Sequence, residues 1–138
     1  MLGQHCLRAW SSTQSAIALS SAEAELYAML DAALRGKGVR NTASEVGMAI
    51  SEPLLLYTDS AAAKTFVSKR GLGDMRHLEL RHLWLQREAN GGQIAVGKVL
   101  GTENPADLLT KFLSKQDIAD RLSRLSLCLN WAEASRDA

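Results

Sequence analysis

The sequence predicts an α/β fold, in which strands and helices alternate along the chain. Residues 54–57 (LLLY) form an unbroken apolar run of the length of a buried strand, and residues 93–101 alternate in the manner of a second strand. The segments around these two stretches place apolar residues three and four positions apart, which is the spacing of an amphipathic helix. This order of elements is typical of a sheet covered by helices.

Length and charge set the broad class of protein. With 138 residues, of which 46% are hydrophobic, the chain has enough apolar material for the core of one domain. Its net charge of +1 predicts neither a nucleic-acid nor a membrane partner, but leaves room for a local basic face. No run approaches the ~20 apolar residues of a membrane span, and residues 1–10 lack the apolar core of a secretory signal. We therefore expect an intracellular protein, cytoplasmic or nuclear, with no membrane partner.

The two cysteines fit this expectation. Cys6 and Cys128 lie near opposite ends of the sequence, and neither belongs to a C-x-x-C pair. Their spacing from the three histidines is not that of a zinc site. Reduced thiols are the expected state.

The first elements are a short strand and a long helical region. Residues 5–11 (HCLRAWS) alternate loosely and predict the strand. Ser20 and Glu23 have the S-x-x-E spacing of a capping box, which predicts that a helix starts there. Each glycine of residues 35–41 (RGKGVRN) is unfavourable in a helix by roughly 1 kcal/mol, so a kink, a break and a loop are all compatible with this segment. Further helix is expected up to about Gly47.

The central strand and the helix after it follow from local residue types. Pro53 opens the strand of residues 52–59, since proline cannot donate to a ladder. The unbroken apolar run predicts that both faces of this strand are covered. A short helix is expected from residue 60 to Gly71.

The remaining elements are expected in the order helix, strand, helix, helix. Residues 74–92 are strongly amphipathic, with Arg81 and His82 near the margin of the apolar side. Residues 93–101 predict a strand. The last two helices are expected to start near Pro105 and Lys115.

Three acidic residues occupy positions from which a carboxylate can reach a ligand. Asp59 ends the central strand, and sites in open α/β sheets gather at the carboxyl ends of strands. Glu25 lies beside the apolar face of the first helix, and Asp107 lies in the first turn of a later one. Together they predict a site for Mg²⁺, which takes oxygen ligands.

Each carboxylate also has a purely structural interpretation. Asp59 can serve as the N-cap of the next helix. Glu25 can sit at the boundary of the packed face with its head in water, while Glu23 fills the capping box. Asp107 can offset the dipole of its helix.

Four blocks of sequence decide between these interpretations. SSAEAELYAM, LLYTDSAAA, RHLELRHLWLQRE and TENPADLLTK, preceded by AWSSTQ, occur in this order. In order and spacing they resemble the ribonuclease H domain of copia-type retrotransposon Pol polyproteins, from about Trp10 to Phe112. The resemblance implies a ribonuclease H-like domain in residues 1–114, here partial, followed by a C-terminal helix and tail in residues 115–138.

The resemblance also implies an activity, a cofactor and partners. Domains of this family cut the RNA strand of RNA–DNA hybrids during reverse transcription, with two Mg²⁺ ions and four carboxylates. Glu25, Asp59 and Asp107 match three of the four. The partners implied are the hybrid and the reverse transcriptase part of the same polyprotein. The candidate substrate-binding residues, from the matched helix and the basic run before it, are Lys64, Arg76, His77 and Arg81.

One family carboxylate has no counterpart in this sequence. It lies on the first strand, upstream of AWSSTQ, and residues 1–9 contain no aspartate or glutamate. We therefore expect an N-terminally truncated domain with weak metal binding and impaired catalysis; the alternative is a catalytically dead remnant that acts only as an interaction module.

The missing segment also affects the sheet. The family sheet has the order 3-2-1-4-5, and the first two strands are absent here. Residues 5–10 are then expected to pair directly with the central strand, or another copy or fragment supplies a strand through the exposed edges, or the chain is unstable alone.

Overall fold

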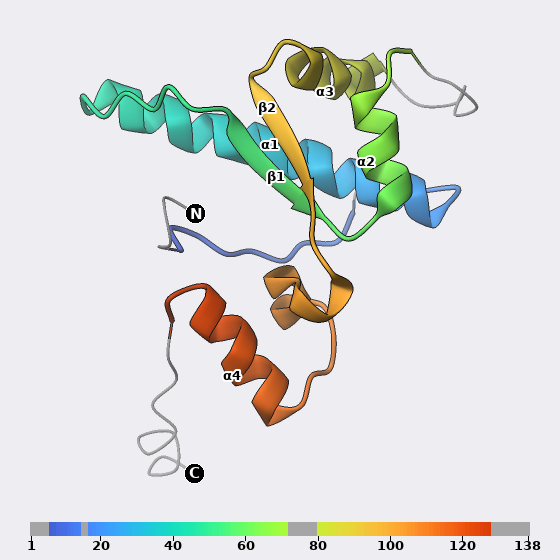
Figure 1. Ribbon diagram of the computed structural model, residues 1–138, viewed down its shortest axis with the longest axis vertical. Coiled ribbons are helices and arrows are strands. Elements are labelled where there is room, and N and C mark those ends of the chain that lie inside the picture. The colour runs from blue at the N-terminus through green and yellow to red at the C-terminus, as the bar shows by residue number, and fades with distance from the viewer. Residues whose placement is uncertain (1–5, 15–16, 72–79, 128–138) are drawn as a thin grey trace. The chain divides into compact units, whose positions relative to one another are not determined.

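The computed structural model describes residues 6–14, 17–71 and 80–127. The chain forms two compact units, each described by itself below. One unit comprises Gln14–Val99, and the other combines Met1–Thr13 with Leu100–Ala138. The described part of the larger unit contains α1, β1, α2, α3 and β2 in that order (Figure 1). The expected division at residue 114 stays a prediction.

Helix α1 spans Ser21–Glu45 and starts at the predicted capping box. The Ser20 Oγ accepts a hydrogen bond from the Glu23 N–H at 3.1 Å, and the Glu23 carboxylate accepts one from the Leu19 N–H at 2.7 Å. The first bond satisfies a backbone donor that the first turn of a helix leaves open, and the second holds the residue before the N-cap. The helix ends where expected, because Gly47 follows with a φ of 83°, which suits glycine.

The two glycines in the middle of α1 do not interrupt it. A Cβ atom on Gly36 would lie 2.7 Å from a terminal methyl carbon of Leu54, so this glycine allows the first strand to approach the helix closely. Gly38 has no heavy atom within 4 Å of the position a Cβ would take. Packing of the helix against the strand outweighs the poor helix propensity of glycine. This packing cannot be read from the local sequence pattern.

Strands β1 (Leu54–Thr58) and β2 (Ile94–Lys98) form a parallel pair, in the register Leu54↔Ile94 through Thr58↔Lys98. Among the described residues the sheet has these two strands only. The strand expected over residues 5–11 is wrong for the part that is described, since residues 6–10 have no strand conformation. An extended segment with no neighbouring strand has no ladder to stabilise it.

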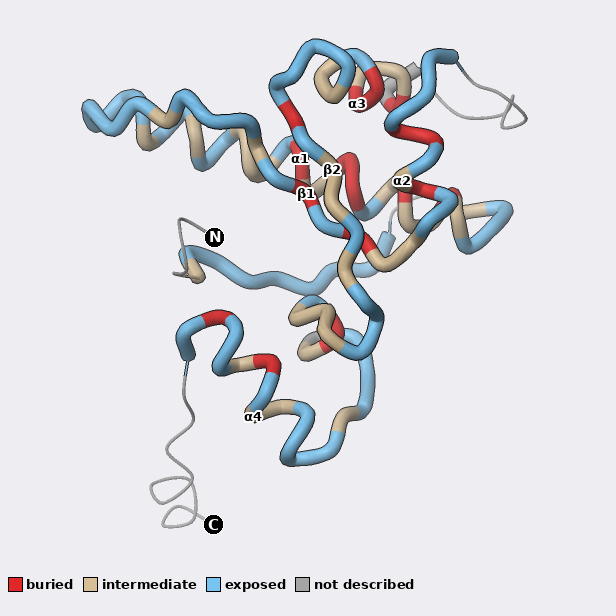
Figure 2. Tube along the Cα trace, in the orientation of Figure 1, coloured by how far each residue is buried: buried red, intermediate tan, exposed pale blue. Residues whose placement is uncertain are grey.

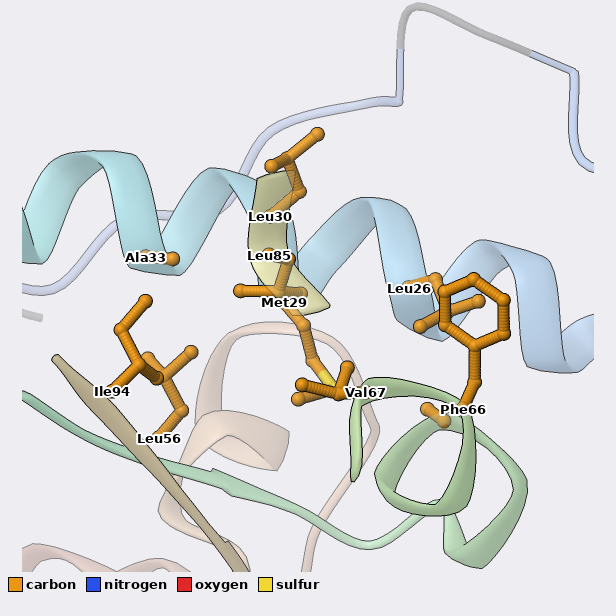
Figure 3. Close-up of a cluster of buried hydrophobic side chains, with 10 residues drawn as sticks. Leu26, Met29, Leu30, Ala33, Leu56, Phe66, Val67, Leu85 and Ile94 are labelled. Carbon is orange, nitrogen blue, oxygen red and sulfur yellow. The ribbon is translucent and has the colours of Figure 1, made fainter. Parts of the chain in front are cut away.

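The core of the larger unit lies between one face of this sheet and the helices. Figure 3 shows Ala33 of α1 above Leu56 and Ile94 of the two strands. The opposite face is open, because Leu55 is 59% and Tyr57 65% exposed. The prediction that β1 is covered on both faces is therefore wrong. The far half of α1 is also largely exposed (Figure 2).

Helices α2 (Ala61–Ser68) and α3 (Leu80–Asn90) are joined by the buried side chain of Gln86. Its Nε2 donates to the carbonyl oxygens of Phe66 and Gly71, both at 2.9 Å. Its Oε1 accepts from the Gly71 N–H at 3.0 Å. One amide thus ties the last turn of α2 and the residue Gly71 beyond it to α3. Contrary to the expected margin position, His82 is fully buried, with its ring edge-to-face against Tyr27 at 4.9 Å.

The described part of the smaller unit contains η1 (Gly101–Glu103), η2 (Pro105–Leu109) and α4 (Lys115–Arg124). The helix expected from Pro105 is a short 3₁₀ segment, whereas the helix expected from Lys115 is confirmed. The Ser114 hydroxyl caps α4 and donates to the Asp117 carboxylate at 2.6 Å. This hydrogen bond, with the nearby Arg121 cation, lowers the pKa of Asp117.

Candidate active-site carboxylates and basic helices

Asp59 follows β1 directly and stands at the carboxyl end of the sheet. Its two neighbours carry the local turn: the Ser60 N–H donates to the Thr58 hydroxyl at 3.1 Å, and the Ser60 hydroxyl accepts from the Ala63 N–H at 3.2 Å. Ser60 is therefore the N-cap of α2, and the interpretation of Asp59 as that cap is wrong.

The Asp59 side chain has no structural role in the described part of the chain. Asp59 is half-buried, and its carboxylate forms no hydrogen bond or ion pair with any residue described. A carboxylate at this position, with the turn held by other residues, is available to a ligand.

The two glutamates at the start of α1 differ in environment. Glu23 is 3% exposed and accepts hydrogen bonds from the Leu19 N–H and from the Tyr27 hydroxyl, the latter at 3.2 Å. These bonds confirm its expected role as a cap. Glu25 is half-buried and takes part in a polar interaction of its own. Its role as a metal ligand stays a prediction.

Asp107 belongs to the smaller unit, where it is 6% exposed. Its carboxylate lies 3.0 Å from the Lys111 ammonium and 3.9 Å from the guanidinium of Arg121, which is equally buried. Burial of a carboxylate is unfavourable unless it is paired, and these two cations provide the pairing. Asp107 lies in the first turn of η2, as expected, and its ion pair with Arg121 also joins η2 to α4.

Arg121 is a residue that the sequence analysis missed. Besides facing Asp107, it donates to the carbonyl oxygens of Asn104 and Asp117, both at 3.3 Å. Its spacing of four residues from Asp117 is a recognisable i,i+4 signal, but that spacing does not reveal that the arginine is buried.

The candidate substrate-binding residues are described unequally. Lys64 is half-buried on α2, whereas Arg76 and His77 lie outside the described residues, as does the side chain of Arg81 on α3. Two basic residues after α2, Lys69 and Arg70, are exposed.

Three basic residues lie on α2 or just after it. None of Lys64, Lys69 and Arg70 forms an ion pair with the described residues. Arg70 also lines an open hollow together with Arg87 of α3. These side chains offer positive charge that no described residue neutralises.

The described residues contain neither a cluster of metal-binding side chains nor a membrane-spanning helix. Within residues 6–14, 17–71 and 80–127, no three histidine, cysteine, aspartate or glutamate side chains gather as a group that could hold a metal ion. Over the same ranges, no helix has the length and apolar character needed to cross a membrane. Cys6 is a free thiol, and Cys128 lies outside the described residues.

The chain is similar in sequence to Pol polyproteins of transposons. It is 30% identical over 107 residues, or 76% of its length, to the retrovirus-related Pol polyprotein from transposon TNT 1-94 of Nicotiana tabacum. It is 27% identical over 116 residues to that from transposon RE2, and 23% identical over 128 residues to that from transposon RE1, both of Arabidopsis thaliana.

These relatives are far longer than the chain, which spans 8–9% of their length. No family model matches the sequence. No solved structure matches it either. Homologues of the chain are thus retrovirus-related Pol polyproteins of transposons, at low identity.

Proposed function

We propose that the chain is a ribonuclease H-like domain of a transposon Pol polyprotein that cleaves the RNA strand of RNA–DNA hybrids with Mg²⁺, at a reduced rate. The observation that carries the proposal is Asp59, whose carboxylate stands at the carboxyl end of β1 and bonds no described residue. The parallel pairing of β1 with β2 supports it, because the sheet order implied by the resemblance places these two strands side by side. The reverse transcriptase part of the same polyprotein is the partner we expect.

The residues present fit a metal site only in part. Asp59 has an uncommitted carboxylate, and the Thr58 and Ser60 hydroxyls hold the turn that presents it. The carboxylate of Asp107, in contrast, is already neutralised by Lys111 and Arg121, so a cation would have to displace those partners. Bound Mg²⁺ would stabilise charge on the scissile phosphate. Competition at Asp107 is one reason to expect weak binding and slow cleavage.

Cleavage of an end-labelled RNA strand, annealed to DNA, tests this proposal. We expect slow, Mg²⁺-dependent cleavage by the full chain that Asp59→Asn abolishes and Asp31→Asn leaves unchanged. Asp31 is the matched control because it lies on α1 and pairs with the neighbouring Arg35 at 2.8 Å. Equal cleavage by wild type and Asp59→Asn, purified in the same way, would show a contaminating nuclease and remove Asp59 from the mechanism.

A second candidate function is nucleic-acid binding without catalysis. The observation that favours it is the charge of Lys64 on α2 and of Lys69 and Arg70 just after it, none of which forms an ion pair with a described residue. Phosphate contacts by such side chains release counterions, so affinity falls as salt rises. We expect the double variant Lys69→Gln/Arg70→Gln to weaken hybrid binding and flatten its salt dependence. We expect Arg35→Gln, which removes a cation already paired with Asp31, to change neither. Binding without any cleavage by the wild type would favour this function over the first.

A further inference from the structure

An open hollow lies between the end of α2 and the last turns of α3, two elements that lie beside each other (Figure 1). Its volume of about 540 Å³ falls in the range of small-molecule sites. Arg70 reaches it from the segment after α2, and Arg87 reaches it from the last turn of α3. Two guanidinium groups from separate elements therefore line the same hollow.

The charge of these two arginines is largely uncompensated. Arg70 forms no ion pair with a described residue. The side chain of Arg87 is 75% exposed, and its guanidinium lies 3.7 Å from the Glu88 carboxylate. That carboxylate already pairs with the Lys37 ammonium. The hollow thus keeps a net positive charge, which favours an anionic ligand.

Hydrogen bonds occupy carbonyl oxygens around the hollow that would otherwise repel an anion. The Gln86 side-chain amide donates to the Gly71 carbonyl oxygen at 2.9 Å, and the Asn90 side-chain amide donates to the Gln86 carbonyl oxygen at 2.8 Å. The Gly91 N–H donates to the Arg87 carbonyl oxygen at 2.9 Å. Because unpaired carbonyls give a helix end its negative partial charge, these bonds weaken that charge beside the arginines.

We infer that the hollow is a phosphate-binding site, in which Arg70 and Arg87 hold the phosphate group of a nucleotide. Arginine suits phosphate because its planar guanidinium can donate two parallel hydrogen bonds to phosphate oxygens. Leu83 is half-buried and adds an apolar surface to the hollow, against which the base or sugar of the ligand can pack. The nucleotide is either free or one unit of a nucleic-acid strand.

The site is separate from the carboxylate on which cleavage depends. Asp59 precedes α2 and Arg70 follows it, and the 8 residues of this helix span about 12 Å. Phosphate binding in the hollow therefore does not require Asp59. Asp59→Asn should leave it unchanged, so a failure of the proposed cleavage and a failure of this site are distinguishable.

NMR titration of the full chain with inorganic phosphate tests the inference. We expect the amide signals of Gly71 and Gly91 to shift first, both in wild type and in Arg35→Gln, which removes a paired arginine of α1. The double variant Arg70→Gln/Arg87→Gln should bind phosphate about tenfold more weakly or worse, with an unchanged circular dichroism spectrum. Shifts that begin elsewhere, no shift at all, or equal binding by the double variant would overturn the site.

Thermal unfolding separates this role from a purely structural one. An arginine near the C-terminus of a helix also offsets the helix dipole, whether or not a ligand is present. Phosphate should raise the melting temperature of the wild type but not that of the double variant, because only the native wild type binds it. A melting temperature that differs between the two proteins by the same amount with and without phosphate would overturn the inference.

Two further ligands distinguish the sources of the phosphate. A short single-stranded oligonucleotide should shift the same amides and bind more tightly than inorganic phosphate if the ligand is part of a strand, a case that rests on the nucleic-acid binding proposed above. Adenosine monophosphate should do so, and the oligonucleotide should not, if the ligand is a free nucleotide. If neither binds more tightly than inorganic phosphate, the assignment to a nucleotide is overturned.

Discussion

Asp59 and Ser60 lie side by side at the junction of β1 and α2 but have different roles. Ser60 caps α2 through its hydroxyl, and Asp59 is left without a structural bond among the described residues. We therefore expect Ser60→Ala to lower the free energy of unfolding by about 1 kcal/mol, and Asp59→Ala to change it by less than about 0.5 kcal/mol. Urea denaturation of both variants measures the difference. Equal destabilisation would show that Asp59 also caps.

Arg121 shows how a buried cation joins two segments. Arg121→Leu would leave the Asp107 carboxylate buried with Lys111 as its remaining cation, which is expected to destabilise the fold by about 2–4 kcal/mol. Arg124 provides the control, since it is half-exposed and pairs with Glu103 at 3.1 Å. Arg124→Leu should change stability by less than about 1 kcal/mol. Thermal unfolding of the two variants distinguishes them, and similar melting temperatures would contradict the role of Arg121.

At the scale of the element, the two glycines of α1 form a natural pair for comparison. Gly38→Ala should stabilise the protein by up to about 1 kcal/mol, because alanine has the higher helix propensity and its Cβ meets nothing. Gly36→Ala gains the same propensity but forces the Leu54 side chain to move. We expect it to be less stable than Gly38→Ala by about 1 kcal/mol or more. Equal stability in urea would mean that α1 and β1 do not pack closely at Gly36.

Local sequence patterns predicted where helices begin and end better than they predicted which other elements pack against each helix or strand. The helix start at Ser20, the helix end near Gly47 and the start of α4 at Lys115 all depend on neighbours in sequence, and all are confirmed. The apolar run of β1 predicted a strand but not its open face, because the run does not tell how many layers cover it. The number of strands in the sheet likewise depends on which segments pair with one another. The sequence of a single segment does not determine that pairing.

At the scale of the whole molecule, the sequence predicted which residues belong to the candidate site but not how their side chains are paired. The sequence indicated Asp59 through its place after a strand, and the resemblance indicated Glu25 and Asp107. It did not reveal that Asp107 is paired with Arg121, since that pairing depends on how η2 meets α4, although Lys111 lies only four residues along the chain from Asp107. Asp59 is thus the residue on which the proposed function depends most.

The most direct test of this account is binding of Mn²⁺, as a paramagnetic substitute for Mg²⁺, followed by NMR of the full chain. A cation held by Asp59 should broaden the amide signals of Asp59 and Ser60 at the lowest Mn²⁺ concentrations, and Asp59→Asn should remove this effect while Asp31→Asn preserves it. Broadening that begins elsewhere, or that is the same with and without the Asp59 carboxylate, would contradict the claim that Asp59 holds a divalent cation.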